Sequence, residues 1–247
     1  AYSAKLPKDR QGEVKHRFVL NLYRLLERLV KNYPDLLLEG CCGGGGRYDA
    51  GMLYYCPQIW CSDNTDAIER LRIQYGTSFA YPMSSISAHV SVCPNHQNGR
   101  VTPFKTRAVC AMQGTFGYEL DLSILSEEEK EMAKKQIAYF KEHYRLFQFG
   151  DYYRLVSPFA DKNYTVWEFA DKDGKEAYAA VVYTDLYSNP NTEIVCMKGL
   201  KEEINYKVWK DEEYIGTISG AALMNVGILL PTPVENYDSY QFYFEAE

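Results

Sequence analysis

A run of three leucines followed by a cluster of glycines most constrains how this chain can fold. Leu36–Leu38 form a short apolar segment, and four consecutive glycines occupy positions 43–46. The leucines predict a short buried strand, and the glycines leave backbone N–H groups uncovered for a closely approaching ligand. The segment 58–67 repeats this plan, because a short apolar stretch ending at Trp60 precedes a polar cluster and a helix. Two strands that end in polar loops are typical of a parallel α/β enzyme, whose site lies at the carboxyl ends of its strands.

The same order of strand, loop and helix continues to about position 125. Further strands are expected at Ser87–Val92 and Arg107–Met112, and a helix at Asp66–Tyr75. Four such units make half of an eight-stranded barrel, so we expect a partial (β/α)8 TIM barrel over residues 1–150. An amphipathic helix over residues 11–33 comes first, although a barrel helix normally follows a strand of its own.

The pattern changes to antiparallel strands after Gly150. Before this point, Ser126 and Glu129 have the spacing of a capping box and begin a helix. After it, two strand patterns flank the hairpin sequence Asp171–Gly174. The strands expected here are Tyr164–Phe169, Ala177–Tyr183, Glu193–Met197, Asn205–Trp209 and Gln241–Phe244. We therefore expect an antiparallel β-sandwich domain over residues 151–247.

Charge and composition narrow the class of partner. The 247 residues carry a net charge of -6, and the basic residues are scattered, which argues against a nucleic-acid or anionic-membrane surface. No apolar stretch approaches the length of a membrane span, and no signal peptide is evident. Seven cysteines without the spacing of a disulfide framework favour a reducing, cytoplasmic compartment. An uncharged substrate fits this balance, and the 15% of aromatic residues suits either a sugar site or a tyrosine-rich β domain.

Asp63 is the strongest candidate for acid catalysis. It follows a predicted strand, precedes a helix and lies close to Trp60 in sequence. Glycosidic hydrolysis needs a carboxylic acid to protonate the leaving oxygen and, in retaining enzymes, a carboxylate nucleophile about 5–5.5 Å away. The cluster Asp63, Asn64 and Asp66 is also suited to capping a helix, which is the commoner role of such residues. The pattern by itself leaves both interpretations open.

Other clusters give weaker indications. The glycine run lacks the Lys-Ser/Thr of a P-loop and the spacing of a dinucleotide fingerprint, so phosphate binding is not favoured. Cys93 and His96, with His89 nearby and Cys56 and Cys61 upstream, raise the possibility of a zinc site, but their spacing matches no standard ligand pattern. A nucleophilic Cys–His pair from the same residues has no supporting local signature. We expect no metal and no cofactor.

Taken together, two long segments resemble the catalytic-domain motifs of glycoside hydrolase family 36, the α-galactosidases. The resemblance rests on LLLEGCCGGGGRYDAGMLYYCPQIWCSDNTDAIERLRIQYGTS and on YPMSSISAHVSVCPNHQNGRVTPFKTRAVCAMQGTFGYELDL. It covers about residues 9–126, and the β-rich region that follows is similar in kind to that family's C-terminal domain. The resemblance implies a retaining hydrolase that removes terminal α-linked galactose from sugars such as melibiose and raffinose, using two aspartates and no cofactor.

The resemblance also implies roles for single residues. The family's acid/base aspartate lies in a Trp-x-Ser-Asp motif, which matches residues 60–63 and gives that role to Asp63. Trp60 would lie at the wall of the same pocket. The family's Cys-x-x-Gly-Gly-Gly-Arg segment contacts galactose, and the matching residues here are Cys41, Gly44, Gly45, Gly46 and Arg47.

Two departures from the family pattern matter. Gly40, Cys42 and Gly43 replace residues that are mostly small and polar in the family, which concerns the fine specificity. The family's nucleophile belongs to a Lys-Trp-Asp motif on the strand just upstream of the position of Ala1, and this chain contains no Lys-Trp-Asp. We therefore expect the C-terminal portion of an α-galactosidase, inactive alone, that works with the N-terminal portion of the same enzyme and as a homo-oligomer.

Alternatives to this function stay open. In one alternative, the chain is an inert piece that serves only as a sugar-binding or assembly module. In another, it acts on a related sugar such as α-linked N-acetylgalactosamine. Bulk around Cys41 and Gly44 would decide the second case, because these residues are expected to face the 2-substituent. Activity of the chain alone would make Asp49 or Asp66 the first candidates for the nucleophile.

Overall fold

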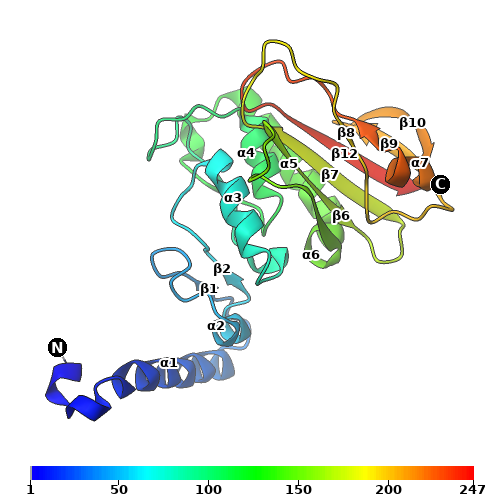
Figure 1. Ribbon diagram of the computed structural model, residues 1–247. Coiled ribbons are helices and arrows are strands. Elements are labelled where there is room, and N and C mark those ends of the chain that lie inside the picture. Colours follow the sequence, from blue (N-terminus) through cyan, green and yellow to red (C-terminus); the bar gives the residue numbers. More distant parts are fainter. Residues whose placement is uncertain (1) are drawn as a thin grey trace. The chain divides into compact units, whose positions relative to one another are not determined.

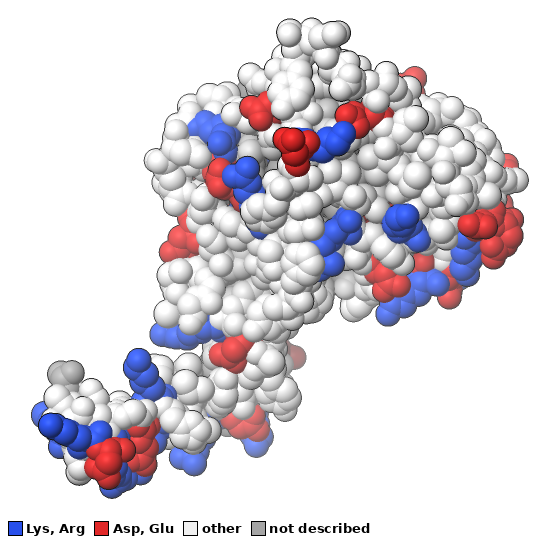
Figure 2. Space-filling model, in the orientation of Figure 1, with Lys and Arg blue, Asp and Glu red and all other residues white. Residues whose placement is uncertain are grey.

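The computed structural model describes residues 2–247 and divides into two compact units, one that ends at Cys61 and one that runs from Ser62 to Glu247. No helix among the described residues is both long and apolar enough to cross a membrane. Positive and negative side chains are intermingled on the face shown in Figure 2, without a broad patch of one sign.

The first unit contains two helices and one pair of parallel strands (Figure 1). Its elements are two short 3-10 turns (Ser3–Lys5 and Lys8–Arg10), α1 (Glu13–Asn32), β1 (Glu39–Gly40), α2 (Ala50–Tyr55) and β2 (Gln58–Ile59). β1 and β2 pair in parallel, with Glu39 opposite Gln58. The helix predicted over residues 11–33 is confirmed, and so is a strand that begins at Gln58.

The first predicted strand is shorter and less buried than its leucines indicated. β1 begins only at Glu39, and Leu37 is 86% exposed. The buried core of this unit consists of Met52, Cys56 and Ile59, with Leu22 of α1 packed against it. The prediction of a buried leucine strand is wrong within this unit, because no element of the unit covers Leu37.

The second unit begins with an α/β region. Its elements are α3 (Ala67–Thr77), a 3-10 turn (Met83–Ser85), β3 (His89–Ser91), α4 (Phe104–Ala111), β4 (Gly117–Glu119), a 3-10 turn (Leu122–Ile124), α5 (Glu127–Glu142) and α6 (Tyr144–Phe149). β3 and β4 pair in parallel. The capping box of Ser126 and Glu129 is present at the start of α5, as the sequence predicted.

The strand predicted at Arg107–Met112 is wrong, because these residues belong to α4 and its end. Of the eight residues of α4, seven are buried, so the helix has no polar face. Hydrophobic periodicity does not distinguish such a fully buried helix from a buried strand. The fourth strand of the region is β4 instead, which the sequence analysis did not predict.

The rest of the chain forms a six-stranded antiparallel sheet in the order β10-β9-β12-β7-β6-β5. The elements are β5 (Asp151–Val156), β6 (Tyr164–Ala170), β7 (Glu176–Tyr183), β8 (Ile194–Val195), β9 (Asn205–Lys210), β10 (Glu213–Ser219), α7 (Gly220–Asn225), β11 (Ile228–Leu229) and β12 (Ser239–Ala246). The predicted hairpin between β6 and β7 is confirmed, with Gly174 at a φ of 70° in its turn.

Both faces of this sheet are covered. On one face, Ala177, Ala179 and Val181 of β7 pack in a core with Val195 of β8 and Leu223 of α7. On the other face, β6 and β7 contact α6, and β7 and β12 contact α4 (Figure 1). The predicted antiparallel β domain is therefore confirmed, and its second layer is the β8–β11 pair together with α7.

Candidate active site

The glycine-rich loop after β1 folds back on itself closely. The Cys42 N–H donates to the Gly44 carbonyl oxygen over 3.0 Å, and Gly44 has a φ of 73°, which L side chains rarely adopt. A Cβ on Gly45 would lie 2.8 Å from the Cys61 carbonyl oxygen, and one on Gly46 would lie 2.5 Å from the Cys42 carbonyl oxygen. Larger residues would therefore change the path of the loop, because these neighbours are backbone atoms.

The loop and Trp60 lie at the same ends of the paired strands. Trp60 follows β2 directly, and its N–H donates to the Gly40 carbonyl oxygen over 2.9 Å. Because β1 and β2 are parallel, the segments that follow them meet at one edge of the pair. The structure thus brings Trp60 together with the loop that carries the other predicted binding residues.

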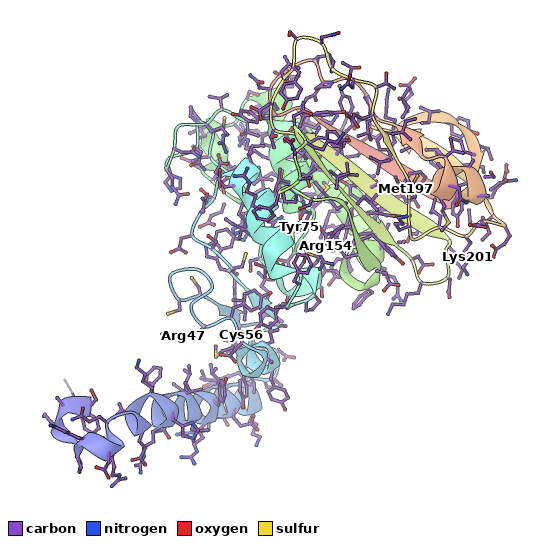
Figure 3. The ribbon with its side chains drawn as sticks, in the orientation of Figure 1. Arg47, Cys56, Tyr75, Arg154, Met197 and Lys201 are labelled. Carbon is purple, nitrogen blue, oxygen red and sulfur yellow. The ribbon has the colours of Figure 1, made fainter. Side chains whose placement is uncertain are left out.

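The predicted binding residues differ in exposure. Cys41 and Arg47 are exposed, and Arg47 lies on the loop in Figure 3. Gly44 and Trp60 are buried, and Gly45 is half-buried. Cys41 and Arg47 therefore offer side-chain groups at the surface of the loop, whereas Gly44 and Gly45 contribute backbone.

Asp49 fixes the far end of this loop, a role that the sequence analysis did not identify. Its Oδ1 atom accepts from the Met52 N–H over 2.9 Å, which caps α2, and from the Tyr23 hydroxyl over 2.8 Å. This hydrogen bond to Asp49 raises the pKa of Tyr23. A Cβ on Gly51 would lie 2.3 Å from the Tyr23 hydroxyl oxygen, so the glycine admits the ring.

Of the two aspartates, Asp66 caps a helix and Asp63 does not. The Oδ1 atom of Asp66 accepts from the Glu69 N–H over 2.8 Å and caps α3, and Arg100 donates to the same atom. Asp63 is exposed, and its carboxylate has no hydrogen-bond or ion-pair partner among residues 2–247. Capping is therefore the role of Asp66, which leaves the carboxylate of Asp63 available for chemistry.

Gln97 holds the backbone on which Asp63 is carried. Its Nε2 atom donates to the Asp63 carbonyl oxygen over 2.8 Å, and its Oε1 atom accepts from the Thr65 N–H over 2.9 Å. Asn95 supports Gln97, because its Oδ1 atom accepts from the Gln97 N–H over 2.9 Å. These bonds hold the backbone of the Asp63 segment and leave its carboxylate unused.

Arg70 also holds the backbone of this segment through Ser62. It is 4% exposed and donates to the Ser62 carbonyl oxygen over 3.2 Å and to the Ser87 carbonyl oxygen over 2.5 Å. Both acceptors are backbone carbonyl groups. Ser62 lies between β2 and α3, and Ser87 lies just before β3. The sequence signal for this network was the row of Asn, Gln and Arg residues after β3, which the zinc hypothesis left unexplained.

Two residues of that zinc hypothesis, His89 and Cys93, have other contacts. His89 Nδ1 lies 2.7 Å from Glu119 Oε2, and the Cys93 thiol donates to the Thr102 carbonyl oxygen over 3.6 Å. Within the part of the chain that the structure describes, no group of three or more His, Cys, Asp or Glu residues is arranged to hold a metal ion. The hypothesis gains no support from this arrangement.

Comparison with known proteins gives matches along most of the chain. The family model described as Melibiase matches residues 1–150, and the model described as Glycosyl hydrolase family 36 C-terminal domain matches residues 164–244. The bifunctional alpha-galactosidase/sucrose kinase AgaSK of Mediterraneibacter gnavus is 52% identical over 94% of this chain, which covers 24% of that protein. Alpha-galactosidase AgaA of Geobacillus stearothermophilus is 46% identical over 99% of this chain, which covers 33% of that protein.

Solved structures match the fold as well as the sequence. A variant of AgaA from Geobacillus stearothermophilus in complex with raffinose superposes with a TM-score of 0.93 at 45% identity, over 98% of this chain and 33% of that chain. The galactosidase domain of AgaSK superposes with a TM-score of 0.91 at 51% identity, over 96% of this chain and 32% of that chain. The chain thus spans between a quarter and a third of the length of these relatives.

Proposed function

Because the chain belongs to glycoside hydrolase family 36, we propose that it is part of a retaining α-galactosidase that hydrolyses terminal α-linked galactose from sugars of the melibiose and raffinose type. The observation that carries this proposal is Asp63, an exposed carboxylate without a partner on a segment whose backbone Gln97 holds. The names of the relatives support it, as does the structure of AgaA in complex with raffinose.

In this proposal Asp63 acts first as an acid and then as a base. It protonates the glycosidic oxygen as the bond to the anomeric carbon breaks, and it then takes a proton from the water that releases the galactose. The Gln97 side chain holds the backbone of Asp63 through both steps by its hydrogen bond to the Asp63 carbonyl oxygen. The glycine loop binds the sugar through its backbone, through Cys41 and through Arg47, and Trp60 forms a wall.

The nucleophile of the retaining reaction comes, in this proposal, from outside these 247 residues. The sequence contains no Lys-Trp-Asp, and Asp49 and Asp66 both serve as helix caps. A carboxylate that accepts hydrogen bonds from a helix N-terminus is stabilised there and is a poor nucleophile. This reaction uses no cofactor and no metal.

The partner proposed for this chain is the N-terminal portion of the same enzyme. Apolar side chains that this portion would cover are exposed on α1, where Phe18 is 58% and Leu25 is 53% exposed. The described strands of the barrel region occur only as two separate parallel pairs, which leaves open edges for further strands. Assembly of the complete enzyme into a homo-oligomer is also part of the proposal.

Two further assignments stand as proposals. We place the boundary between the barrel and the β domain at residues 150 and 151, and the limits of the two family matches, at 150 and 164, support it. We also propose a reducing, cytoplasmic compartment, which the absence of a disulfide among the seven cysteines of the described chain supports.

Hydrolysis of an aryl α-galactoside tests the proposed function. The chain is assayed alone and mixed with a polypeptide that supplies the upstream strands, and we expect activity only in the mixture. Asp63→Asn should lower kcat/KM for a poorly activated galactoside by about 10²–10⁴-fold, because the general acid is lost. Asp161→Asn, which also removes an exposed carboxylate, serves as the matched control and should change little.

Three other outcomes would decide against this reading. Activity of the chain alone would place the nucleophile within these residues. Activity in neither sample would favour an inert sugar-binding or assembly module. Preference of the mixture for an α-N-acetylgalactosaminide over the galactoside would assign the site to the 2-acetamido sugar.

A further inference from the structure

A cavity lies in the unit 62–247 and shares no residue with the candidate active site. Its volume is about 250 Å³, and α5, β9, β12 and the turn between β9 and β10 line it. A cavity that combines apolar walls with a few polar groups is the usual form of a small-molecule site. The proposed function uses none of its residues.

One wall of this cavity is aromatic. Trp209 of β9 and Tyr243 of β12 are directly opposite each other in the sheet, and their ring centroids are 5.7 Å apart. Trp209 is only half-buried, so part of a large apolar ring remains open. Tyr139 of α5 also lines the cavity, which places aromatic rings on both the sheet and the helix. Such rings suit the apolar C–H face of a flat, otherwise polar ligand.

Two side-chain amides that line the cavity are oriented by hydrogen bonds to their oxygen atoms, and their nitrogen atoms can still donate. Gln136 Oε1 accepts from the Tyr118 hydroxyl over 2.6 Å, and Gln241 Oε1 accepts from the Tyr178 hydroxyl over 2.9 Å. Within residues 2–247 the amide nitrogens of Gln136 and Gln241 have no acceptor, and the same is true of the Tyr139 hydroxyl. These two amide nitrogens and the Tyr139 hydroxyl can therefore donate hydrogen bonds to a ligand in the cavity.

The turn at the rim of the cavity is a two-residue hairpin loop. Asp211 and Glu212 have φ values of 48° and 71°, as a type I′ turn between the paired residues Lys210 and Glu213 requires. Asp211 is held there, because its carboxylate accepts from the Gln241 N–H over 3.0 Å and lies 2.8 Å from Lys105 Nζ. Glu212 is exposed and has no partner among the described residues.

We propose that this cavity binds a neutral pyranose ring, the terminal galactose unit of an oligosaccharide, as a non-catalytic second sugar site. The C–H face of the ring stacks on Trp209, the amides of Gln136 and Gln241 donate to ring hydroxyl oxygens, and Glu212 accepts from a hydroxyl. An anionic ligand is disfavoured, because the lining carries Asp211 and Glu212 against a single lysine. The proposal depends on the proposed function only in naming galactose as the unit bound.

Binding of methyl α-galactopyranoside to the full 247-residue chain tests this proposal. We expect saturable shifts of the Trp209 indole resonance in a ¹H–¹⁵N NMR titration, together with shifts of the Gln136 and Gln241 side-chain amides. Trp209→Ala should weaken binding by at least about tenfold, because the stacking surface is lost. Glu212→Gln should weaken it about three- to tenfold, because one acceptor is lost. Thermal unfolding of each variant checks that it folds.

Asp63→Asn distinguishes this site from the proposed active site, and it should leave the Trp209 shifts and their midpoint unchanged. Binding that Asp63→Asn or a glycine-loop change abolishes, and Trp209→Ala does not, would overturn the second site and leave the proposed function intact. Absence of any shift at Trp209 up to a high millimolar concentration of the glycoside would overturn it as well. Conversely, intact binding with no hydrolysis in the reconstituted mixture would refute the proposed function alone.

Discussion

The glycine-loop unit and the six-stranded sheet differ in how much of their own apolar surface they bury. The buried apolar residues of the described loop unit are Met52, Cys56, Ile59 and Trp60, and its long helix α1 has no buried residue. In the sheet, all seven residues of β6 and seven of the eight residues of β7 are buried. The sheet therefore buries its apolar residues within this chain, whereas the loop unit leaves apolar side chains exposed that another segment could cover.

The two regions are therefore expected to contribute differently, the sheet to stability and the loop unit to the proposed function. The predicted binding residues Cys41, Gly44 and Arg47 belong to the sparsely packed unit, whereas the sheet supplies most of the buried side chains. Hydrophobic burial is the dominant favourable term in folding. We therefore expect changes in the sheet to lower the free energy of unfolding, and changes around the loop to affect activity first.

The largest expected effect contrasts Phe244 with Leu37. Phe244 of β12 is fully buried, so Phe244→Ala should lower the free energy of unfolding by about 3–5 kcal/mol. Leu37 is 86% exposed, and Leu37→Ala should change it by no more than about 0.5 kcal/mol. Urea unfolding followed by circular dichroism measures both, and equal losses would show that the sheet is not the more stable region.

Glu168 of β6 tests the sheet at a buried polar group. Its carboxylate accepts from the Lys198 N–H over 2.7 Å and from the Gly199 N–H over 3.1 Å. At low pH the wild-type carboxyl is neutral, and its hydroxyl oxygen can still accept an N–H, whereas the NH2 group introduced by Glu168→Gln cannot. We therefore expect a loss of about 1–3 kcal/mol in the free energy of unfolding at low pH. An unchanged midpoint of urea unfolding would mean that this contact adds nothing to the sheet.

The pH dependence of the same contact has a definite sign. Burial raises the pKa of Glu168 in the folded protein above its ordinary value of 4.5, although the two backbone N–H groups lower it in part. The contribution of this carboxyl to stability is therefore fully present below the unfolded pKa and declines as the pH rises through the folded pKa. The free-energy difference between wild type and Glu168→Gln should shrink from pH 4 upward, and a difference that grew would contradict this.

Arg154 tests how the sheet holds the α/β region of its own unit. It donates to the Ser78 carbonyl oxygen over 2.5 Å and lies 4.2 Å from the centre of the Phe79 ring, beside Tyr75 in Figure 3. Arg154→Ala should lower the free energy of unfolding by about 1–2 kcal/mol, since it removes charged hydrogen bonds and ring contacts. Arg154→Lys keeps the charge but loses the planar contact, so it should recover less than half of the loss.

The smallest expected effect compares the two aspartates of the candidate site. Asp66→Ala removes the cap of α3 and should cost about 1 kcal/mol of unfolding free energy. Asp63→Ala should leave stability within about 0.5 kcal/mol of wild type, because no contact of its side chain is lost. A larger loss for Asp63→Ala than for Asp66→Ala would reverse the roles assigned to them.

Much of the local structure could be predicted from the sequence. The apolar stripe of residues 11–33 predicted the helix found at Glu13–Asn32, Ser126 and Glu129 predicted a capping box, and Asp171–Gly174 predicted a hairpin. Each of these signals depends on neighbours within a few residues. The prediction failed at α4, where burial on all sides removed the periodicity that separates a helix from a strand.

The sequence alone predicts which residues bind sugar and transfer protons, and it indicates the family. The fold was needed to show that Asp66 caps a helix while the Asp63 carboxylate has no partner among the described residues, and that Gln97 holds the Asp63 backbone from 34 positions away. It also placed Trp209, Gln136 and Glu212 around one cavity. Such partners are far apart in sequence, and hydrogen bonds act over about 3 Å, so only the folded chain can select them.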